Sequence, residues 1–460
     1  MEEQKSLAKM GTKPVGSLML SLGVPMIISM VLQALYNIVD SAFVSNMSEG
    51  GEMALNALTL AFPVQMLMVA VSVGTGVGVN ALLSKNLGMG NEKKANYVSG
   101  NAIFLGLIIY ALCLLFGLFG VNTYISTQTS NHEIYEMAVD YLRICSVMSM
   151  GTVFFAIFEK TLQATGLSIY STIAMITGAV MNIILDPIFI YGLFGLPAMG
   201  VKGAAYATII GQIASGALGF IFHIKYNKAV KTCIKYLKPS GRIIREIYAI
   251  GFPAIIAQAL MSVMTYGFNI ILVRVDEAMV TAYGLYYKIQ QFILFAAFGL
   301  RDAITPIVSF NYGMKSKSRV KDGVKYGIIY TFIIMVIGII LLECCASPLS
   351  KIFGLSGTTQ DLCVSAMRII STSFIFAGLN VAFQGIFQAL EGGIESFVIS
   401  ICRQLIFVLP VAWGFSLFAM QSMDNAWLVW LTFPIAEFIS AVIACIFMRR
   451  IYKKKINVLN

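Results

Sequence analysis

Charged residues are scarce in this chain, and their scarcity excludes an ordinary soluble protein. Asp, Glu, Lys and Arg make up 12% of its 460 residues, whereas 58% of the residues are hydrophobic. A soluble domain carries about a quarter charged residues, which keep its surface in water. The mean hydropathy of +0.82 therefore indicates that most of the outer surface faces lipid.

Catalytic and metal-binding signatures are also missing. The sequence has no HExxH, GxSxG or Walker motif, and its eight cysteines are scattered without a CxxC pair. We interpret the cysteines as small core residues. The run Gly74–Gly78 looks like a phosphate-binding loop, but no strand precedes it, and close helix packing explains its small residues better. We expect neither an enzyme nor an ATP-driven pump, and no cofactor.

Long apolar runs are abundant, and twelve of them predict transmembrane helices. Each is about twenty residues or longer, which is the length that a helix needs to cross a bilayer core. A barrel is excluded because its strands would alternate apolar and polar residues. The first run is too long for a cleavable signal peptide. The helices are expected at 18–44, 54–83, 97–119, 138–164, 170–192, 203–224, 246–273, 279–309, 324–345, 362–389, 397–419 and 426–448.

Most basic residues lie on one side of these predicted helices. The net charge of +10 comes from the two tails, the loops after the second and eighth helices and the linker 225–245, and we count Lys160 and Arg403 on the same side. The outer loops hold only Lys202, Arg274 and Lys351. By the positive-inside rule both termini are cytoplasmic, and the charge needs no nucleic acid to explain it.

The sequence contains an internal repeat, in which the second half matches the first at an offset of 225 residues. Ordered matches include Ser84 with Ser309, Asn86 with Asn311, Arg143 with Arg368, and Gln163 with Gln388. We predict an all-α integral membrane protein whose twelve transmembrane helices form two pseudo-symmetric six-helix bundles. The N-lobe is 1–224, a basic cytoplasmic linker is 225–245, and the C-lobe is 246–460. Both bundles insert with the same orientation, so a cavity between them can open to either side. We interpret the linker as a solvated, partly amphipathic interfacial helix.

The first predicted helix carries an acid on a polar stripe. Asp40 shares one helix face with Gln33, Tyr36 and Asn37, because residues three or four apart lie above one another. An acid inside an apolar span is costly and indicates a functional site. The alternative is that Asp40 is merely interfacial and wetted from outside.

A second acid, Asp186, lies in the fifth helix one turn after Asn182. The sixth helix offers a matching stripe with Ala204 and Thr208 at a spacing of four. Two carboxylates near each other cannot both be ionised at low cost, so such a pair can bind and release a proton. It can also hold Na⁺, with Asn182 and Thr208 as oxygen ligands.

Prolines interrupt the first helix of each half. Pro25 and Pro253 each remove one backbone hydrogen bond, so a bend is expected at both positions. A hinge that follows the charge on Asp40 and a static kink are equally compatible with the sequence. Lys288, well inside the eighth helix, either snorkels to the interface or faces the cavity. Glu437 in the twelfth helix is placed similarly.

These residues resemble a known family. The segments Gly23–Asp40, Asn182–Phe189, Gly203–Thr208 and Asn311–Gly313 are similar to the multidrug and toxic compound extrusion (MATE) transporters, and the similarity covers essentially the whole chain. The resemblance implies a V-shaped pair of six-helix bundles. It also implies export of cationic or amphipathic compounds against entry of H⁺ or Na⁺.

The resemblance also assigns residues to roles. It implies an N-lobe cation site at Asp40, Asn182, Asp186 and Thr208, with a carbonyl from Ala204. Asp40 and Asp186 would be the coupling pair. A second branch of the family carries a glutamate at the position of Met261 and an aspartate in helix ten. This chain has neither, because position 261 is a methionine and helix ten (362–389) has no acid beyond its start. The chain is therefore similar to the DinF/MepA-like branch, with membrane-embedded acids in the first half only.

The expected function is secondary active multidrug efflux in a bacterial cytoplasmic membrane, by a monomer surrounded by lipid and with small organic cations as substrates. Candidates for the cavity lining are Gln33, Tyr36, Asn37, Met261 and Lys288. A lipid-linked oligosaccharide flippase of the same superfamily is the alternative. It should line its cavity with several Lys or Arg, and helices one, two and seven carry almost none in their interiors.

Overall fold

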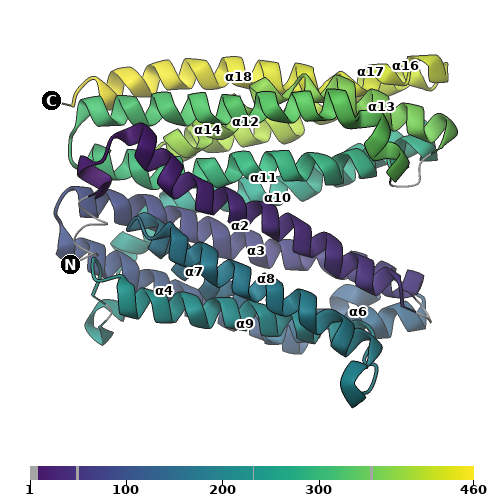
Figure 1. The fold of residues 1–460 in the computed structure, drawn as a ribbon, viewed down its shortest axis with the longest axis horizontal. Helices are drawn as coiled ribbons and strands as arrows, with labels where there is room; N and C mark the ends of the chain where they lie inside the picture. Colours follow the sequence, from purple (N-terminus) through teal and green to yellow (C-terminus); the bar gives the residue numbers. More distant parts are fainter. Residues whose placement is uncertain (1–8, 48–50, 232, 353–355, 460) are drawn as a thin grey trace. The chain divides into compact units, whose positions relative to one another are not determined.

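A computed structural model describes residues 9–47, 51–231, 233–352 and 356–459, in which all regular structure is helical (Figure 1). The main helices of the first half are α2 (Val15–Ser45), α3 (Gly51–Gly88), α4 (Glu92–Leu115), α5 (Val121–Ser126), α6 (His132–Val147), α7 (Met150–Ala164), α8 (Ser168–Tyr191) and α9 (Val201–Tyr226). Those of the second half are α10 (Gly241–Val273), α11 (Glu277–Gly313), α12 (Lys317–Ile352), α13 (Gly357–Ser371), α14 (Phe374–Ala389), α15 (Gly393–Ile401), α16 (Val408–Ala419), α17 (Trp427–Trp430) and α18 (Thr432–Ile451).

The helical segments match the predicted membrane architecture. In the described part of the chain, ten are long and apolar enough to cross a membrane, and two bent pairs bring the number to twelve if each pair is one span. The pair α6 and α7 is bent by 46°, and α13 and α14 by 53°. The predicted all-α membrane fold is confirmed, but the spans 138–164 and 362–389 are broken rather than continuous.

Hydroxyl side chains explain the second of these breaks. Ser371, Thr372 and Ser373 each donate a hydrogen bond to the carbonyl three residues earlier, at 2.8, 2.6 and 2.6 Å. Such local bonds satisfy the carbonyls at the end of a helix and compete with its continuation. The apolar run therefore continues in sequence while the helix stops.

The chain divides into two compact units, and the division passes through α2 and α10. Unit 1 comprises Met1–Lys13 and Ile28–Ile255, and unit 2 comprises Pro14–Ile27 and Ile256–Asn460. Pro25 lies inside α2 and Pro253 inside α10, each two residues before the division. Each of these helices thus gives its first part to one unit and its remainder to the other.

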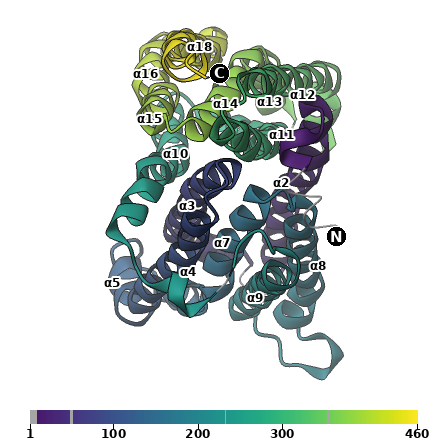
Figure 2. The same ribbon diagram turned by 90° about the vertical axis from the view of Figure 1, so that its left-hand side faces the viewer.

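The internal repeat is present in the packing of each unit. The hydroxyl of Ser84 on α3 donates to the carbonyl of Ala164 at 3.0 Å, and Ser309 on α11 donates to Ala389 at 2.7 Å. In unit 1 α3 packs on α7, and in unit 2 α11 packs on α14, as the end-on view of the helices shows (Figure 2). The sequence repeat is therefore a structural repeat.

The glycines at 74–78 pack α3 against the first part of α10. A Cβ atom on Gly78 would lie 2.2 Å from the carbonyl oxygen of Ile247, and one on Gly74 would lie 2.6 Å from the backbone nitrogen of Ile255. No side chain fits at either position. The interpretation of this run as packing residues is confirmed.

The expectation of a helix in the linker is wrong. Apart from the short 3₁₀ turn η3 (Ile234–Leu237), the described residues between α9 and α10 are not helical. The backbone N–H of Lys231 donates to Asn96 Oδ1 at 2.7 Å, and that of Ser240 donates to Asn101 Oδ1 at 2.8 Å. Because asparagines of α4 satisfy these amides, the linker needs no helical hydrogen bonds.

The eight cysteines form no disulfide. Cys113, Cys145, Cys363 and Cys402 are buried, as predicted for core residues. Cys233 and Cys344 are exposed, so the interpretation is wrong for these two.

Candidate functional site

Close packing of α8 on α9 positions the polar residues of the predicted cation site. A Cβ atom on Gly178 would lie 2.5 Å from the carbonyl oxygen of Gly211, and one on Gly211 would lie 2.6 Å from that of Gly178. Paired glycines let two membrane helices approach closely. Side chains one turn away, Asn182 and Thr208, are thereby brought within hydrogen-bonding reach.

Asn182 connects α8 to α9. Its Nδ2 donates to Asp186 Oδ1 and to Thr208 Oγ1, both at 3.3 Å. Asp186 follows it by one helical turn, as the sequence spacing predicted. Ala204 is fully buried one turn before Thr208 inside the continuous helix α9.

The carboxyl groups of Asp40 and Asp186 lie within hydrogen-bonding distance of each other. Asp186 is fully buried, and Asp40 is partly buried. In the described part of the chain, Asp40 Oδ1, Asp186 Oδ2 and Asn182 Oδ1 are buried oxygens without a hydrogen-bond partner. Two carboxylates in contact repel each other when both are ionised. The arrangement therefore fits one shared proton or one small cation that prefers oxygen ligands.

A contact at the ends of the helices supports this pairing. The hydroxyl of Tyr191, the last residue of α8, donates to the carbonyl oxygen of Phe43 on α2 at 2.7 Å. The two rings also meet edge to face, with centroids 6.3 Å apart. This contact fixes α2 on α8 about one turn beyond Asp40 and Asp186.

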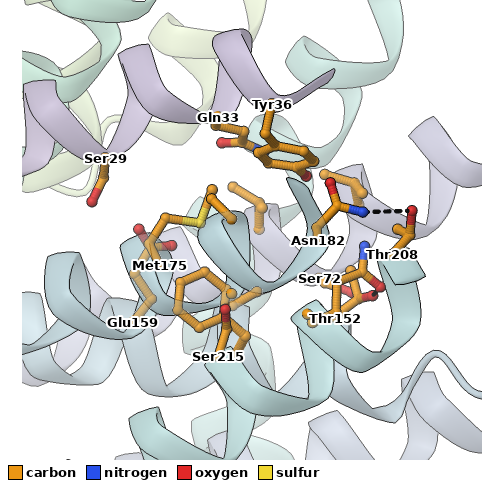
Figure 3. A pocket seen from close by; sticks show the side chains of 18 of the residues that line it. Ser29, Gln33, Tyr36, Ser72, Thr152, Glu159, Met175, Asn182, Thr208 and Ser215 are labelled. Atoms are coloured by element: carbon orange, nitrogen blue, oxygen red, sulfur yellow. Dashed lines mark hydrogen bonds between the residues drawn. The ribbon is translucent and has the colours of Figure 1, made fainter. Parts of the chain in front are cut away.

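A cavity of about 100 Å³ lies beside the acid pair, entirely within unit 1. Four predicted site residues line it: Gln33, Tyr36, Asn182 and Thr208. Figure 3 shows Gln33 and Tyr36 extending from α2 above the bond between Asn182 and Thr208. Further polar and flexible lining residues are Ser29, Ser72, Thr152, Met175, Gln212 and Ser215. The cavity thus combines neutral polar groups with an aromatic ring and a methionine.

Sequence reasoning missed an acid in this cavity, Glu159 on α7. Its side chain is 8% exposed and lines the cavity, and it accepts a hydrogen bond from Gln163 at 3.1 Å. The neighbouring Lys160, which we counted with the inner charges, is 1% exposed and donates to Gln163 at 3.1 Å. Glu159 lies within the predicted span 138–164, so the rule that marked Asp40 would have found it.

The structure does not bring the remaining cavity candidates to this cavity. Met261 lines a separate cavity in unit 2. Lys288 is exposed on α11 and lines neither of the two cavities. The side chain of Asn37 lies outside the described residues.

The expectation that membrane-embedded acids lie in the first half only is wrong. Asp302 on α11 is 4% exposed, and Glu437 on α18 is 8% exposed. Each is paired with an arginine, at 3.0 Å from Arg301 and 2.6 Å from Arg403. Because the buried Arg403 and the half-buried Arg301 neutralise them, these acids differ from the Asp40–Asp186 pair. Arg403, which the sequence analysis assigns to the inner charges, is therefore a buried partner of Glu437.

Membrane-spanning helices, an internal repeat and a buried acid pair beside a small cavity define an integral membrane transporter rather than an enzyme. The chain belongs to the MatE family, whose model matches residues 25–188 and 253–413, one stretch in each half. The predicted resemblance to the MATE transporters is thereby confirmed.

Relatives and solved structures agree with this assignment. The chain is 27% identical over 437 residues to the multidrug export protein MepA of Staphylococcus aureus, which covers 94% of this chain and 93% of the relative. It is 25% identical to MepA of Staphylococcus saprophyticus, with coverage of 93% and 92%. An outward-facing multidrug resistance MATE transporter has the same fold, with a TM-score of 0.90 at 23% identity over 100% of this chain and 99% of that chain.

Proposed function

We propose that this chain exports small cationic or amphipathic organic compounds in exchange for H⁺ or Na⁺. The observation that carries the proposal is the contact between Asp40 and Asp186 at a point with three unpartnered buried oxygens. Such a pair is stabilised by one bound cation and destabilised without it. The names of the relatives, which are multidrug export proteins, support export as the direction of transport.

Ion entry supplies enough free energy for this exchange. One charge moving down 100 mV releases about 2.3 kcal/mol. A tenfold uphill gradient of a neutral compound costs about 1.4 kcal/mol. For a monovalent cation exchanged one for one, the potential cancels and the ion gradient alone drives export.

The proposal includes the arrangement of the chain in the membrane. Both termini lie in the cytoplasm of a bacterium, because the basic loops follow the positive-inside rule. The N-lobe 1–224 carries the ion coupling, the linker 225–245 joins the lobes, and the C-lobe 246–460 completes the transport path. Pro25 and Pro253 act as hinges during alternating access. A monomer suffices, because one chain holds both repeats.

The lining of the first cavity favours export of cations over flipping of a lipid-linked oligosaccharide. Among its described lining residues none is Lys or Arg, whereas Glu159 contributes an acid. A flippase for a pyrophosphate-linked lipid needs basic groups for the phosphates. An acidic cavity with Tyr36 and Met175 instead suits flat organic cations.

Transport of ethidium into inverted vesicles tests the proposed function. An imposed pH gradient and an imposed Na⁺ gradient, compared in one preparation, identify the coupling ion. The Asp40→Asn variant should lose ion-driven ethidium transport at least tenfold, because a lone carboxylate no longer needs the shared cation. Export by the folded Asp40→Asn variant at the rate of the parent chain would contradict the assigned coupling role.

A further inference from the structure

A groove of about 290 Å³ lies between α14 and α18 of unit 2 and shares no lining residue with the cavities described above. Its described lining side chains are hydrophobic, except that of Arg449. Both helices belong to candidate membrane spans, and Phe438 and Ile446 on the groove are 51% and 59% exposed. Hydrophobic side chains that are exposed on a membrane-spanning helix face lipid, so the groove opens to the bilayer.

Small residues at helical spacing form the floor of the groove. Ala441 and Cys445 lie one turn apart on α18, and Arg449 follows after one further turn. Ala441 is 4% exposed, whereas the neighbouring row of Val442 and Ile446 is 45% and 59% exposed. Because small side chains lie beside a row of larger ones, a channel runs along α18 and ends at a basic residue.

Two aromatic rings lie at the other end of the groove. Phe376 of α14 meets Phe438 of α18 edge to face, with ring centroids 5.2 Å apart. The helical rise between positions 438 and 449 is about 16 Å. This length is close to half of the hydrocarbon core of a bilayer, which is about 30 Å thick. The groove therefore has the length of the apolar part of one leaflet, with its basic end where the headgroups begin.

The first half of the chain has neither the open space nor the basic end at the equivalent place. At the repeat offset of 225 residues, Cys445 corresponds to Phe220 and Arg449 to Ile224. The ring of Phe220 packs on that of Phe158, with centroids 5.4 Å apart. An aromatic ring thus stands where the second half has a small side chain. The groove is particular to the second half and is not a consequence of the repeat.

We propose that this groove binds one acyl chain of an anionic phospholipid, whose phosphate contacts Arg449. Arg449 is exposed in the last turn of α18, and a guanidinium matches a phosphate with two parallel N–H groups. Lys453 and Lys454, both exposed just beyond the helix, attract a negatively charged headgroup to the same end. The lipid comes from the cytoplasmic leaflet, a clause that rests on the arrangement in the membrane proposed above.

The volume of the groove suits a single hydrocarbon chain. An apolar cavity of about 150 Å³ takes one benzene ring, so a groove of about 290 Å³ takes on the order of a dozen carbon atoms. A lipid tail gains no hydrophobic free energy when it leaves the bilayer for the groove, because both are apolar. The affinity must therefore come from close packing along the groove and from the phosphate contact at its end.

Two phospholipids with identical acyl chains test the basic end. Native mass spectrometry of the purified full chain, titrated with dioleoyl phosphatidylglycerol or dioleoyl phosphatidylcholine, gives the dissociation constant of the first lipid bound. The parent chain should prefer phosphatidylglycerol. In Arg449→Gln this preference should fall about fivefold, because the anionic headgroup loses its basic partner. Both lipids reach both sides of the protein in detergent, so the result does not depend on the proposed orientation.

Filling the groove tests where the chain binds. Cys445→Phe introduces the ring that the first half carries at position 220, so both lipids should bind about fivefold more weakly. Cys445→Ser keeps the volume and should bind both lipids as the parent does. Cys445→Leu fills less of the groove and provides a second measurement, with a smaller loss of affinity for both lipids.

A neighbouring arginine separates the site from a general loss of positive charge. Arg450 is exposed on the same turn as Arg449 but does not line the groove. Arg450→Gln should change the preference for phosphatidylglycerol less than twofold. A loss as large as that in Arg449→Gln would make the attraction a property of the whole basic tail and would overturn the proposed site.

Three further results would overturn the proposal. The first is unchanged binding of both lipids by a Cys445→Phe variant whose thermal unfolding matches that of the parent. The second is displacement of phosphatidylglycerol by an equal concentration of glycerol phosphate, which carries the phosphate without an acyl chain. The third is a dimer of the parent chain that Cys445→Phe dissociates, because a second copy would then occupy the groove.

Discussion

At the scale of single residues, Asn182 holds the candidate cation site together. Its amide nitrogen donates to oxygens on two helices, while its own Oδ1 is buried and unpartnered. An amide in this position stabilises the ionised form of Asp186 and leaves an oxygen free for a cation. It therefore contributes both to the charge of the site and to its ligands.

Replacing this amide should weaken ion binding more than folding. In Asn182→Leu, the coupling ion loses an oxygen ligand, and Asp186 loses a donor, so the ion concentration for half-maximal export should rise about tenfold. Vesicle transport at a series of pH values and Na⁺ concentrations measures it. Thr177→Val on the same helix is the control, because the Thr177 hydroxyl bonds only to its own helix, at Ile173. An unchanged ion dependence in Asn182→Leu would remove this residue from the site.

The sequence predicts the acid pair because two features are local. Helical spacing places Asn182 and Asp186 on one face, and the cost of an acid in lipid marks both Asp40 and Asp186. Lining residues such as Ser72 and Thr152 carry no such signal, since only the tertiary packing of α3 and α7 decides which side chains reach the cavity. The pairing of Arg403 with Glu437 is invisible for the same reason, because 34 residues separate them.

At the scale of helix pairs, each half packs a basic side chain over a glycine, but the side chain comes from a different helix of the pair in each half. In unit 1 Lys160 of α7 packs over Gly76 of α3, where a Cβ atom would lie 2.7 Å from Lys160 Cγ. In unit 2 Arg301 of α11 packs over Gly385 of α14, where the corresponding distance is 2.8 Å. Positions 76 and 301 match in the repeat, as do 160 and 385. The equivalent space therefore holds a basic side chain in both halves. In unit 1 this side chain comes from α7, and in unit 2 it comes from α11, the counterpart of α3.

In each half the acid lies on the same helix as the basic residue, directly next to it in sequence. Glu159 precedes Lys160, and its repeat counterpart is Gln384. Asp302 follows Arg301, and its counterpart is Val77. The acid and the base change helix together, because a buried charge left without its partner is strongly destabilising.

Transplanting the arrangement of the second half into the first tests this equivalence. Lys160→Gly alone should lower the free energy of unfolding by about 3–5 kcal/mol, because Glu159 loses its adjacent cation. The variant Gly76→Arg/Val77→Asp/Glu159→Gln/Lys160→Gly should recover at least half of that loss. Thermal unfolding in detergent measures both. A fourfold variant no more stable than Lys160→Gly would show that the two sites are not interchangeable.

Helix positions follow from hydropathy, whereas helix breaks do not. The apolar run from 362 to 389 continues through Ser371, Thr372 and Ser373. Hydropathy averaged over this stretch therefore predicts one continuous span. The break depends on hydroxyls that donate to backbone carbonyls, and hydropathy does not predict whether such local bonds form. The linker fails as a helix for a related reason, since Asn96 and Asn101 on another helix satisfy its amides.

At the scale of the whole molecule, two helices belong to both units. The division crosses α2 after Ile27 and α10 after Ile255, each two residues past a proline. A proline inside a helix lacks one hydrogen bond, so bending there costs less than elsewhere. Any change in the relation between the units must deform these two helices, and the prolines mark where the deformation is cheapest.

Removing one proline should therefore slow transport without weakening binding. In Pro25→Ala the restored N–H stiffens α2, so the maximal rate of ethidium export should fall about threefold to tenfold, a rise of about 0.7–1.4 kcal/mol in the barrier. The dissociation constant for ethidium should stay within a factor of two. Pro63→Ala is the matched control, because Pro63 lies inside α3, which the division does not cross, and its rate should not change. Equal rates for Pro25→Ala and the parent would show that α2 does not flex at Pro25 during transport. The flexibility needed for transport would then have to reside in α10, where Pro253→Ala repeats the test.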